Sequence, residues 1–141
     1  MRLLEDGASA TVVKALQQLM EFSPNYGWAL TPNLADGVRH ILDKVDEGNA
    51  FVGHGYLLLV NEFEPWYGRD KVLSEELVLR LPDQPAYNLR PIPYFIEALA
   101  KVRGCNIVLV GNSYTSDKLS RIYQSRNHGF KPCSEIFYKV I

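Results

Sequence analysis

Several glutamates lie within the two longest strand-like stretches of the sequence, where a carboxylate could act as a general base. We single out Glu76, because the alternation of side chains along a strand places it on the face opposite the apolar Leu77. The ordinary alternative is a solvated glutamate near the start of a strand. The other carboxylates available on these stretches are Glu62, Glu64 and Glu75.

The histidines and cysteines show no metal-binding arrangement. His40 follows Asp36 by four residues, which places both on one face of a helix, but no third ligand is in view and a solvated face is the better interpretation. Cys105 and Cys133 are far apart and neither belongs to a C-x-x-C pair, so we expect reduced structural thiols. The sequence therefore predicts no metal site and a reducing compartment.

The stretch LRLPDQPAYNLRPIPYFIEALAK, residues 79–101, begins like a buried strand and ends like an amphipathic helix. Such a junction can bind phosphate, because the first N–H groups of a helix have no internal partner. Here Pro91 and Pro93 each remove one N–H group, and each should force the preceding residue, Arg90 or Ile92, out of the helical region. We expect both prolines within the first helical turn and weak or no phosphate binding.

The composition argues against two classes of partner. The 141-residue chain has 15 basic and 16 acidic residues, which gives no electrostatic reason to expect nucleic acid or an anionic membrane. No stretch approaches the ~20 apolar residues of a membrane helix, and no signal-like run opens the sequence. With 47% hydrophobic residues the chain can bury a core, so we expect one domain over residues 1–141, located in the cytoplasm.

Strand-like and helical patterns alternate along the chain. A short strand over residues 2–5 is followed by helices over 12–20 and 34–45, the second capped by Thr31 with Pro32 at its first position. Strands over 50–53, 55–64 and 72–81 should form an antiparallel meander. The pattern then predicts a helix over 91–103 and an apolar strand over 106–110 that is covered on both faces.

The strand over 106–110 should pair in parallel with residues 77–81, with the intervening helix crossing over right-handedly. Thr115 or Ser116 should cap a last helix that ends at Gly129, and residues 134–141 should form a final strand. The expected fold class is α/β (α+β): a mixed central sheet, mostly antiparallel with one parallel pair, flanked by about four helices.

This element order resembles that of the GNAT (Gcn5-related N-acetyltransferase) superfamily. The local similarity lies in NIVLVGNSYTSDKLSRIYQSRNHGFKP, residues 106–132, where an apolar strand, a polar loop, a helix bearing a tyrosine and a Gly-Phe pair follow one another as they do in that family. The resemblance implies a GNAT-like acyltransferase fold, with acetyl-CoA as cosubstrate and no integral cofactor. The chain looks like a degenerate or atypical member of the kind found in bacteriophages.

The family's pyrophosphate signature, Gln/Arg-x-x-Gly-x-Gly/Ala, is lost in this chain. Its positions fall on Tyr87, Arg90 and Ile92, so the resemblance implies at most weak binding of acetyl-CoA. Residues that the resemblance places against the coenzyme are Leu79, Leu81, Arg90, Asn112 and Ser116.

The resemblance also implies chemical roles for aromatic residues. Tyr123 matches the tyrosine that protonates the leaving thiolate, although it lies two residues further from Gly-Phe than is usual. The alternative is that Tyr123 belongs to the apolar stripe of its helix. Tyr26, Trp28 and Trp66, with Tyr67, fall in connections that border the acceptor groove in the family. Three interpretations of these aromatic residues remain: they bind the substrate, they form a protein interface, or they cover the core.

Two classes of function remain. The sequence favours a GNAT-fold protein that has lost its coenzyme site and serves as a binding or structural component, for example in a phage particle or an inhibitory complex. It would bind a protein partner or itself, in the host cytoplasm or the virion, with no nucleic acid, membrane or metal. The alternative is an active acyl-CoA-dependent N-acetyltransferase with an atypical phosphate-binding turn. The fold does not decide between them.

Overall fold

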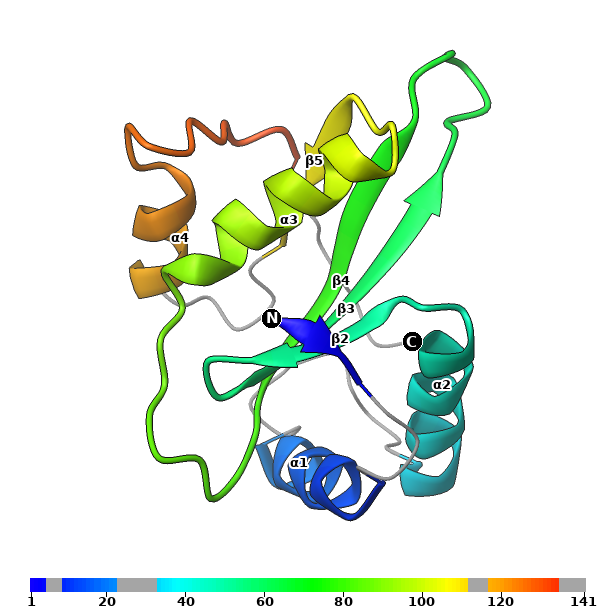
Figure 1. The fold of residues 1–141 in the computed structure, drawn as a ribbon, viewed down its shortest axis with the longest axis vertical. Coiled ribbons are helices and arrows are strands. Elements are labelled where there is room, and N and C mark those ends of the chain that lie inside the picture. The colour runs from blue at the N-terminus through cyan, green and yellow to red at the C-terminus, as the bar shows by residue number, and fades with distance from the viewer. Residues whose placement is uncertain (5–8, 23–32, 112–116, 135–141) are drawn as a thin grey trace, which may run out of the picture.

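The computed structural model describes residues 1–4, 9–22, 33–111 and 117–134 of the chain. Their helices and strands form a sheet with helices on both faces (Figure 1). The strands are β1 (Arg2–Leu3), β2 (Ala50–Gly53), β3 (Tyr56–Phe63), β4 (Val72–Arg80) and β5 (Ile107–Leu109). The helices are α1 (Ser9–Phe22), α2 (Leu34–Asp46), α3 (Pro91–Val102) and α4 (Asp117–Tyr123). This is the mixed α+β architecture that the sequence predicts.

The described strands form one five-stranded sheet in the order β1-β2-β3-β4-β5, antiparallel from β1 to β4 and parallel between β4 and β5. The predicted parallel pair is therefore confirmed, but its register is wrong. Ile107–Leu109 pair with residues 72–74 and not with 77–81. Hydrogen bonds of Lys71 set this register, because its carbonyl accepts the Ile107 N–H at 3.3 Å and its Nζ donates to the Arg103 carbonyl at 2.9 Å. These two hydrogen bonds hold the end of α3 and the start of β5 next to the beginning of β4.

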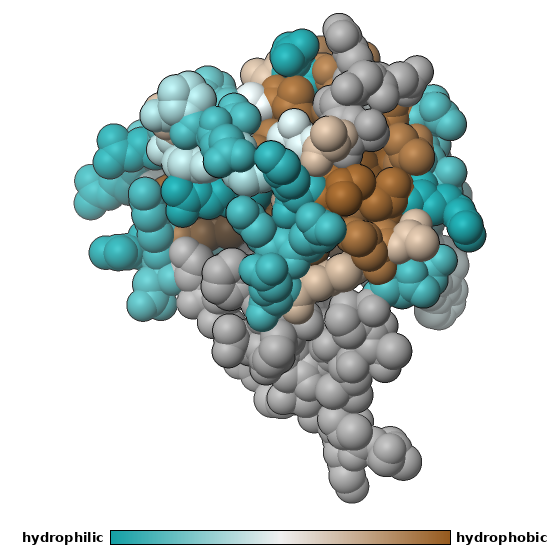
Figure 2. All heavy atoms as spheres, turned by 90° about the horizontal axis from the view of Figure 1, so that it is seen from below, coloured by the Kyte–Doolittle hydropathy of each residue, from teal (hydrophilic) through white to brown (hydrophobic). Residues whose placement is uncertain are grey.

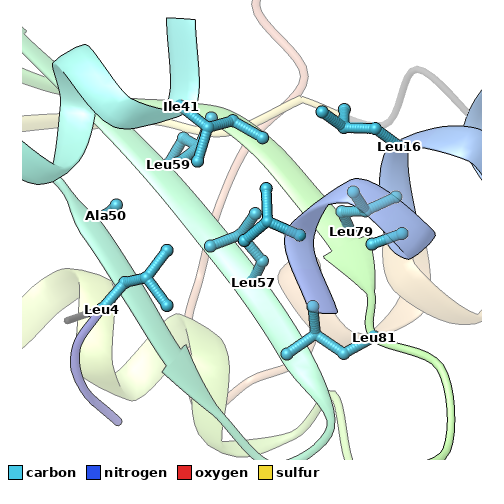
Figure 3. Close-up of a cluster of buried hydrophobic side chains, with 10 residues drawn as sticks. Leu4, Leu16, Ile41, Ala50, Leu57, Leu59, Leu79 and Leu81 are labelled. Carbon is cyan, nitrogen blue, oxygen red and sulfur yellow. The ribbon is translucent and has the colours of Figure 1, made fainter. Parts of the chain in front are cut away.

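Each face of the sheet has its own hydrophobic core. The core beneath α1 and α2 contains apolar residues of both helices, of β2, β3 and β4, and of the positions just after β1 and β4: Leu4, Leu16, Ile41, Ala50, Leu57, Leu59, Leu79 and Leu81 (Figure 3). On the opposite face, residues of β2, β3 and β4 pack against Ile92 and Ile96 of α3: Phe51, Leu58, Val60, Leu73 and Val78. This alternation is what period-two strands with two buried faces require.

The beginning of α3 confirms one prediction and contradicts another. The helix begins at Pro91, so both prolines lie in its first turn. Arg90, however, has helical dihedral angles (φ −60°, ψ −36°), although it precedes a proline. A tight turn holds it there, since the Asn88 Oδ1 accepts the Arg90 N–H at 3.1 Å and the Leu89 carbonyl accepts the Ile92 N–H at 3.1 Å.

Several element boundaries also differ from the predicted ones. The N-cap of α2 is Asn33 and not Thr31, because the Asn33 side chain accepts the Asp36 N–H at 3.2 Å. Strand β5 has three residues, and Ile107 and Leu109 are each 37% exposed, so it is not covered on both faces. Helix α4 ends at Tyr123, before Gly129, because turns occupy the intervening residues. Thr115, Ser116 and residues 135–141 lie outside the described residues.

Gly55 provides a stability prediction for the junction between β4 and α3. It has φ +85°, and a Cβ there would lie 2.5 Å from the Tyr87 ring and 2.6 Å from the Ala86 carbonyl oxygen. We expect Gly55→Ala to lower the free energy of unfolding by about 2–4 kcal/mol in urea denaturation, through strain and overlap. Gly48→Ala is the matched control, since Gly48 has φ +73° with nothing within 4 Å, and should cost only about 1 kcal/mol. Equal losses would show that the packing against Tyr87 is unimportant.

Candidate functional site

A β-bulge in β4 determines where its two adjacent glutamates point. Leu59 pairs with Leu77, but the next residue of β3, Val60, pairs with Glu75, so Glu76 is the extra residue on β4. Glu75 then lies on the α3 face with Val60, whereas Glu76 and Leu77 both lie on the α2 face. The prediction that Glu76 faces away from Leu77 is therefore wrong, because alternation fails at the bulge.

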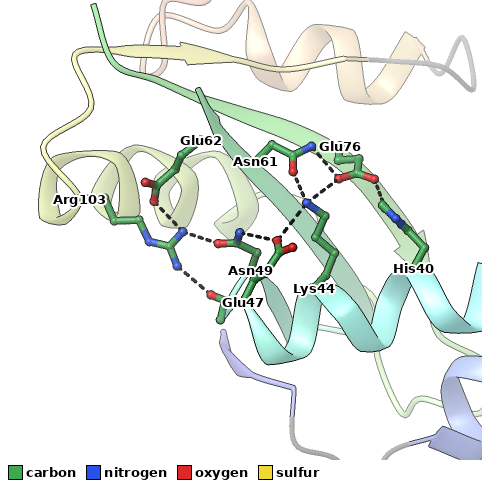
Figure 4. Close-up of polar contacts among 9 residues, drawn as sticks. His40, Lys44, Glu47, Asn49, Asn61, Glu62, Glu76 and Arg103 are labelled. Carbon is green, nitrogen blue, oxygen red and sulfur yellow. Dashed lines mark hydrogen bonds and ion pairs between the residues drawn. The ribbon is translucent and has the colours of Figure 1, made fainter. Parts of the chain in front are cut away.

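Glu76 belongs to a polar network that fixes α2 to the sheet (Figure 4). Its carboxylate contacts the His40 Nε2, accepts the Asn61 Nδ2–H at 2.7 Å and lies 3.5 Å from the Lys44 Nζ. Lys44 is only 8% exposed, and its ammonium group also lies 3.3 Å from Glu47. An ammonium group this buried needs a counter-charge. Glu76 is accordingly engaged as the partner of a buried lysine.

A substitution of Glu76 should therefore change stability more than chemistry. We expect Glu76→Gln to lower the free energy of unfolding by about 1–2 kcal/mol, because Lys44 loses one of its two carboxylate partners and keeps Glu47. Chemical denaturation of the wild type and the variant checks this expectation, and unchanged stability would contradict the role of Glu76 as a partner of Lys44.

Glu75 lies where β4 and β5 part. The parallel pairing ends at Ser74 and Leu109, while β4 continues to Arg80. One oxygen of Glu75 accepts the N–H of Gly111 at 2.9 Å and so bridges the two chain segments. Burial raises the pKa of Glu75 to about 7 against the lowering effect of that hydrogen bond, and the charge of Glu76 adds to the rise. Glu75 is thus a carboxyl group that gains and loses a proton near neutral pH.

The side chain of Tyr123 is buried (5% exposed) in α4, together with Leu119, as the core-stripe interpretation predicts. Its hydroxyl group has no hydrogen-bond partner among the described residues, which is unusual for a buried polar group. Burial, and after it the negative charge of Glu75, raise the pKa of Tyr123 above its ordinary value. The charge of Glu75 therefore acts on the hydroxyl group of Tyr123.

The segment after α4 holds Tyr123 in place. The Tyr123 carbonyl accepts the Phe130 N–H at 3.1 Å, and the two rings meet edge to face at 5.4 Å. His128 connects this segment to α3, since its Nδ1 lies 3.0 Å from the Glu97 carboxylate and its ring lies 4.2 Å from that of Tyr94. The Gly-Phe turn thus positions the tyrosine against the rest of the fold.

The beginning of α3 offers no free backbone donor in its first positions. Pro91 and Pro93 have no N–H group, and the N–H groups of Arg90 and Ile92 bond to Asn88 and Leu89. The Arg90 side chain is exposed, with no ion pair among the described residues. A diphosphate held by helix N-terminal amides does not fit here.

Other predicted ligand residues do not gather at one place. The side chains of Leu79 and Leu81 are in the core beneath α1 and α2, and the Leu81 backbone is engaged by Gly55 and by the Tyr87 hydroxyl group. Trp66 and Tyr67 are 93% and 77% exposed in the β3–β4 turn. Asn112, Ser116, Tyr26 and Trp28 lie outside the described residues.

The remaining charged candidate residues also form ion pairs or hydrogen bonds with neighbouring side chains. Glu62 binds Lys71 at 3.2 Å and Arg103 at 2.8 Å, and it belongs to a structural ion-pair cluster. His40 contacts Glu76 and Asp36 lies 3.9 Å from Arg39. The described part of the chain contains no group of three or more His, Cys, Asp or Glu side chains suited to a metal ion. None of its helices has the length and apolar character of a membrane span.

Comparison with known proteins identifies the fold. No protein-family model and no curated protein matches the sequence. A crystal structure of a probable acetyltransferase superposes with a TM-score of 0.66 at 9% identity, covering 98% of this chain and 93% of that one. A predicted acetyltransferase from Clostridium acetobutylicum, solved with acetyl-CoA, gives 0.62 at 12% identity, covering 97% and 92%. A GNAT family acetyltransferase from Staphylococcus aureus gives 0.57 at 11% identity, covering 99% and 96%. The chain therefore has a GNAT-like fold.

Proposed function

We propose that this protein is a member of the GNAT superfamily that transfers an acyl group from a thioester to an amine. The observation that carries the proposal is the electrostatic interaction of Glu75 with Tyr123. Glu75, at the point where β4 and β5 part, has a pKa of about 7, and its charge acts on a buried hydroxyl group that has no hydrogen-bond partner among the described residues. Shifted pKa values and unsatisfied buried donors concentrate at functional sites.

The fold supports the proposal without deciding it. Proteins with a similar fold are described as acetyltransferases, and one of them was solved with acetyl-CoA. Because one fold can serve several functions, the assignment depends on the Glu75–Tyr123 pair.

In the proposed reaction, ionised Glu75 takes a proton from the ammonium group of the acceptor. The free amine attacks the thioester carbonyl carbon, the new C–N bond forms, and the C–S bond breaks. The Tyr123 hydroxyl group donates its proton to the leaving thiolate, and the resulting phenolate takes up the second proton that the attacking nitrogen loses as the amide forms. Each role matches the protonation state that neutral pH gives the residue: Glu75 is largely ionised above pH 7, and Tyr123 stays protonated.

The charge of Glu75 links the two proton transfers. While Glu75 is ionised, its negative charge raises the pKa of Tyr123 and makes it a weaker acid. Once Glu75 has taken the acceptor's proton, that influence disappears and Tyr123 becomes a stronger acid. This change occurs in the order that the reaction requires, since the thiolate leaves after the amine has lost its proton.

The first residues of α3 favour a second candidate function. Because their N–H groups are already hydrogen-bonded, the chain would be a binding or structural component without a coenzyme site, for example in a phage particle or an inhibitory complex. The exposed Trp66 and Tyr67 would suit a protein partner or self-association. Such a component would reside in the cytoplasm or in a virion.

One experiment distinguishes the two candidate functions. The protein is incubated with acetyl-CoA and a panel of primary amines that includes polyamines, amino sugars and lysine peptides, and thiol release and acetylated product are both followed. Acyl transfer that is lost in the Glu75→Gln/Tyr123→Phe double variant supports the enzyme. Thiol release no faster than in that variant, for every amine, would favour the binding component.

A further inference from the structure

The occupied N–H groups at the beginning of α3 bear on which thioester the proposed enzyme uses. From Arg90 to Pro93, two residues have no N–H group and the other two donate to Asn88 and Leu89. A helix N-terminus binds phosphate through free N–H groups, and these four positions have none.

The loop before α3 is held in this conformation by its own contacts. The Tyr87 hydroxyl group donates to the Leu81 carbonyl at 2.8 Å, and the Asn88 N–H donates to the His54 carbonyl at 3.0 Å. Gly55 lets the loop approach closely, because any Cβ at this position would overlap Tyr87 and Ala86. A rearrangement that freed the amides would have to break these contacts together.

Among the described residues, Arg80 and Arg90 do not replace the amides. The Arg80 guanidinium lies 3.6 Å from the centroid of the Tyr87 ring and is committed to that contact. Arg90 is exposed, and a single exposed charge contributes little and is screened by salt.

Another surface beside Glu75 can still hold the thioester arm. Within the described residues, β4 beyond Ser74 is an extended edge with a strand partner only on its β3 side. A pantetheine arm carries amide groups that can pair with such an edge, as an added peptide strand does.

We propose that the site recognises the acyl-pantetheine portion of its donor and makes no productive contact with a nucleotide diphosphate. This inference rests on the proposed function for the identity of the donor as a thioester. The substrate class is then any pantetheine thioester, and the nucleotide of coenzyme A adds almost nothing to binding.

The test measures binding, so that it does not depend on turnover. Dissociation constants are determined by NMR titration at low ionic strength for pantetheine, coenzyme A and adenosine 3′,5′-bisphosphate. We expect the first two to agree within about fivefold, both near or above about 1 mM, and the nucleotide alone not to compete. Arg90→Ala should change the constant for coenzyme A by less than about twofold.

Coenzyme A binding at least about 100-fold tighter than pantetheine, or competition by the nucleotide, would overturn the inference. So would the absence of binding by both pantetheine and coenzyme A. Equal binding without acyl transfer would support the inference and count against the proposed function, so the two failures are distinguishable. In an active preparation, kcat/KM for acetyl-pantetheine should lie within about fivefold of that for acetyl-CoA.

Discussion

Tyr123→Phe is expected to lower turnover by about 100-fold or more while leaving the protein as stable as the wild type or more stable. The loss of turnover follows from the removal of a general acid, which typically raises the rate of a reaction by about 10²- to 10⁴-fold. The gain in stability follows from burial, because the hydroxyl group has no hydrogen-bond partner among the described residues and its desolvation costs about 1–3 kcal/mol. The phenyl ring keeps its packing against Phe130.

Steady-state kinetics and urea denaturation of one preparation check both effects. Tyr56→Phe is a suitable control, since Tyr56 is a partly buried tyrosine of β3 that the proposed chemistry does not use. A variant at Tyr123 that loses stability and keeps its turnover would identify this tyrosine as a core residue only.

Glu75→Gln is expected to lower turnover by about 100-fold or more at pH 8, because glutamine cannot accept the acceptor's proton. Its shape is preserved, and its amide oxygen can still accept the Gly111 N–H, so the junction of β4 and β5 should remain. Glu76→Gln is the matched control, one residue away on the other face. Equal losses of turnover in the two variants would contradict the assignment of the base.

The same substitution should change how stability depends on pH. The pKa of Glu75 is about 7 in the folded protein, above the ordinary value of 4.5, so the folded state binds the proton more tightly than the unfolded state. Stability from this group is therefore fully present below pH 4.5 and is lost as the pH rises toward 7. By linkage the full loss, reached above pH 7, is on the order of 3 kcal/mol. Glu75→Gln should match the wild type near pH 4.5 and exceed its stability at pH 8.

Sequence periodicity predicted the elements well where a hydrophobic face decides them. The stripe through Phe95, Ile96 and Leu99 made α3 predictable, and the two prolines marked its first turn. The register of the parallel pair was not predictable in this way. It depends on contacts of Lys71 with Arg103 and Ile107, which are distant in sequence and carry no local pattern.

The candidate site was predictable only in part. The resemblance of the last helix to the GNAT family identified Tyr123, and burial of its hydroxyl group became visible only in the structure. Strict alternation along β4 favours Glu76 over Glu75 as the base, and the bulge removes the reason for that preference. The sequence does hold one signal of the bulge, since Ser74, Glu75 and Glu76 are three successive polar residues in a strand whose other residues are mostly apolar. A strand with two buried faces does not accommodate such a run without an irregularity.

The pH dependence of kcat/KM for acyl transfer, measured for the wild type, Glu75→Gln and Glu76→Gln, tests the central claim most directly. A general base acts when ionised, so the wild-type rate should rise with pH through about 7, the pKa of Glu75. We expect Glu76→Gln to keep this rise and Glu75→Gln to lose it together with most of its activity. A Glu75→Gln variant that retains the wild-type profile would contradict the role of Glu75 as the base.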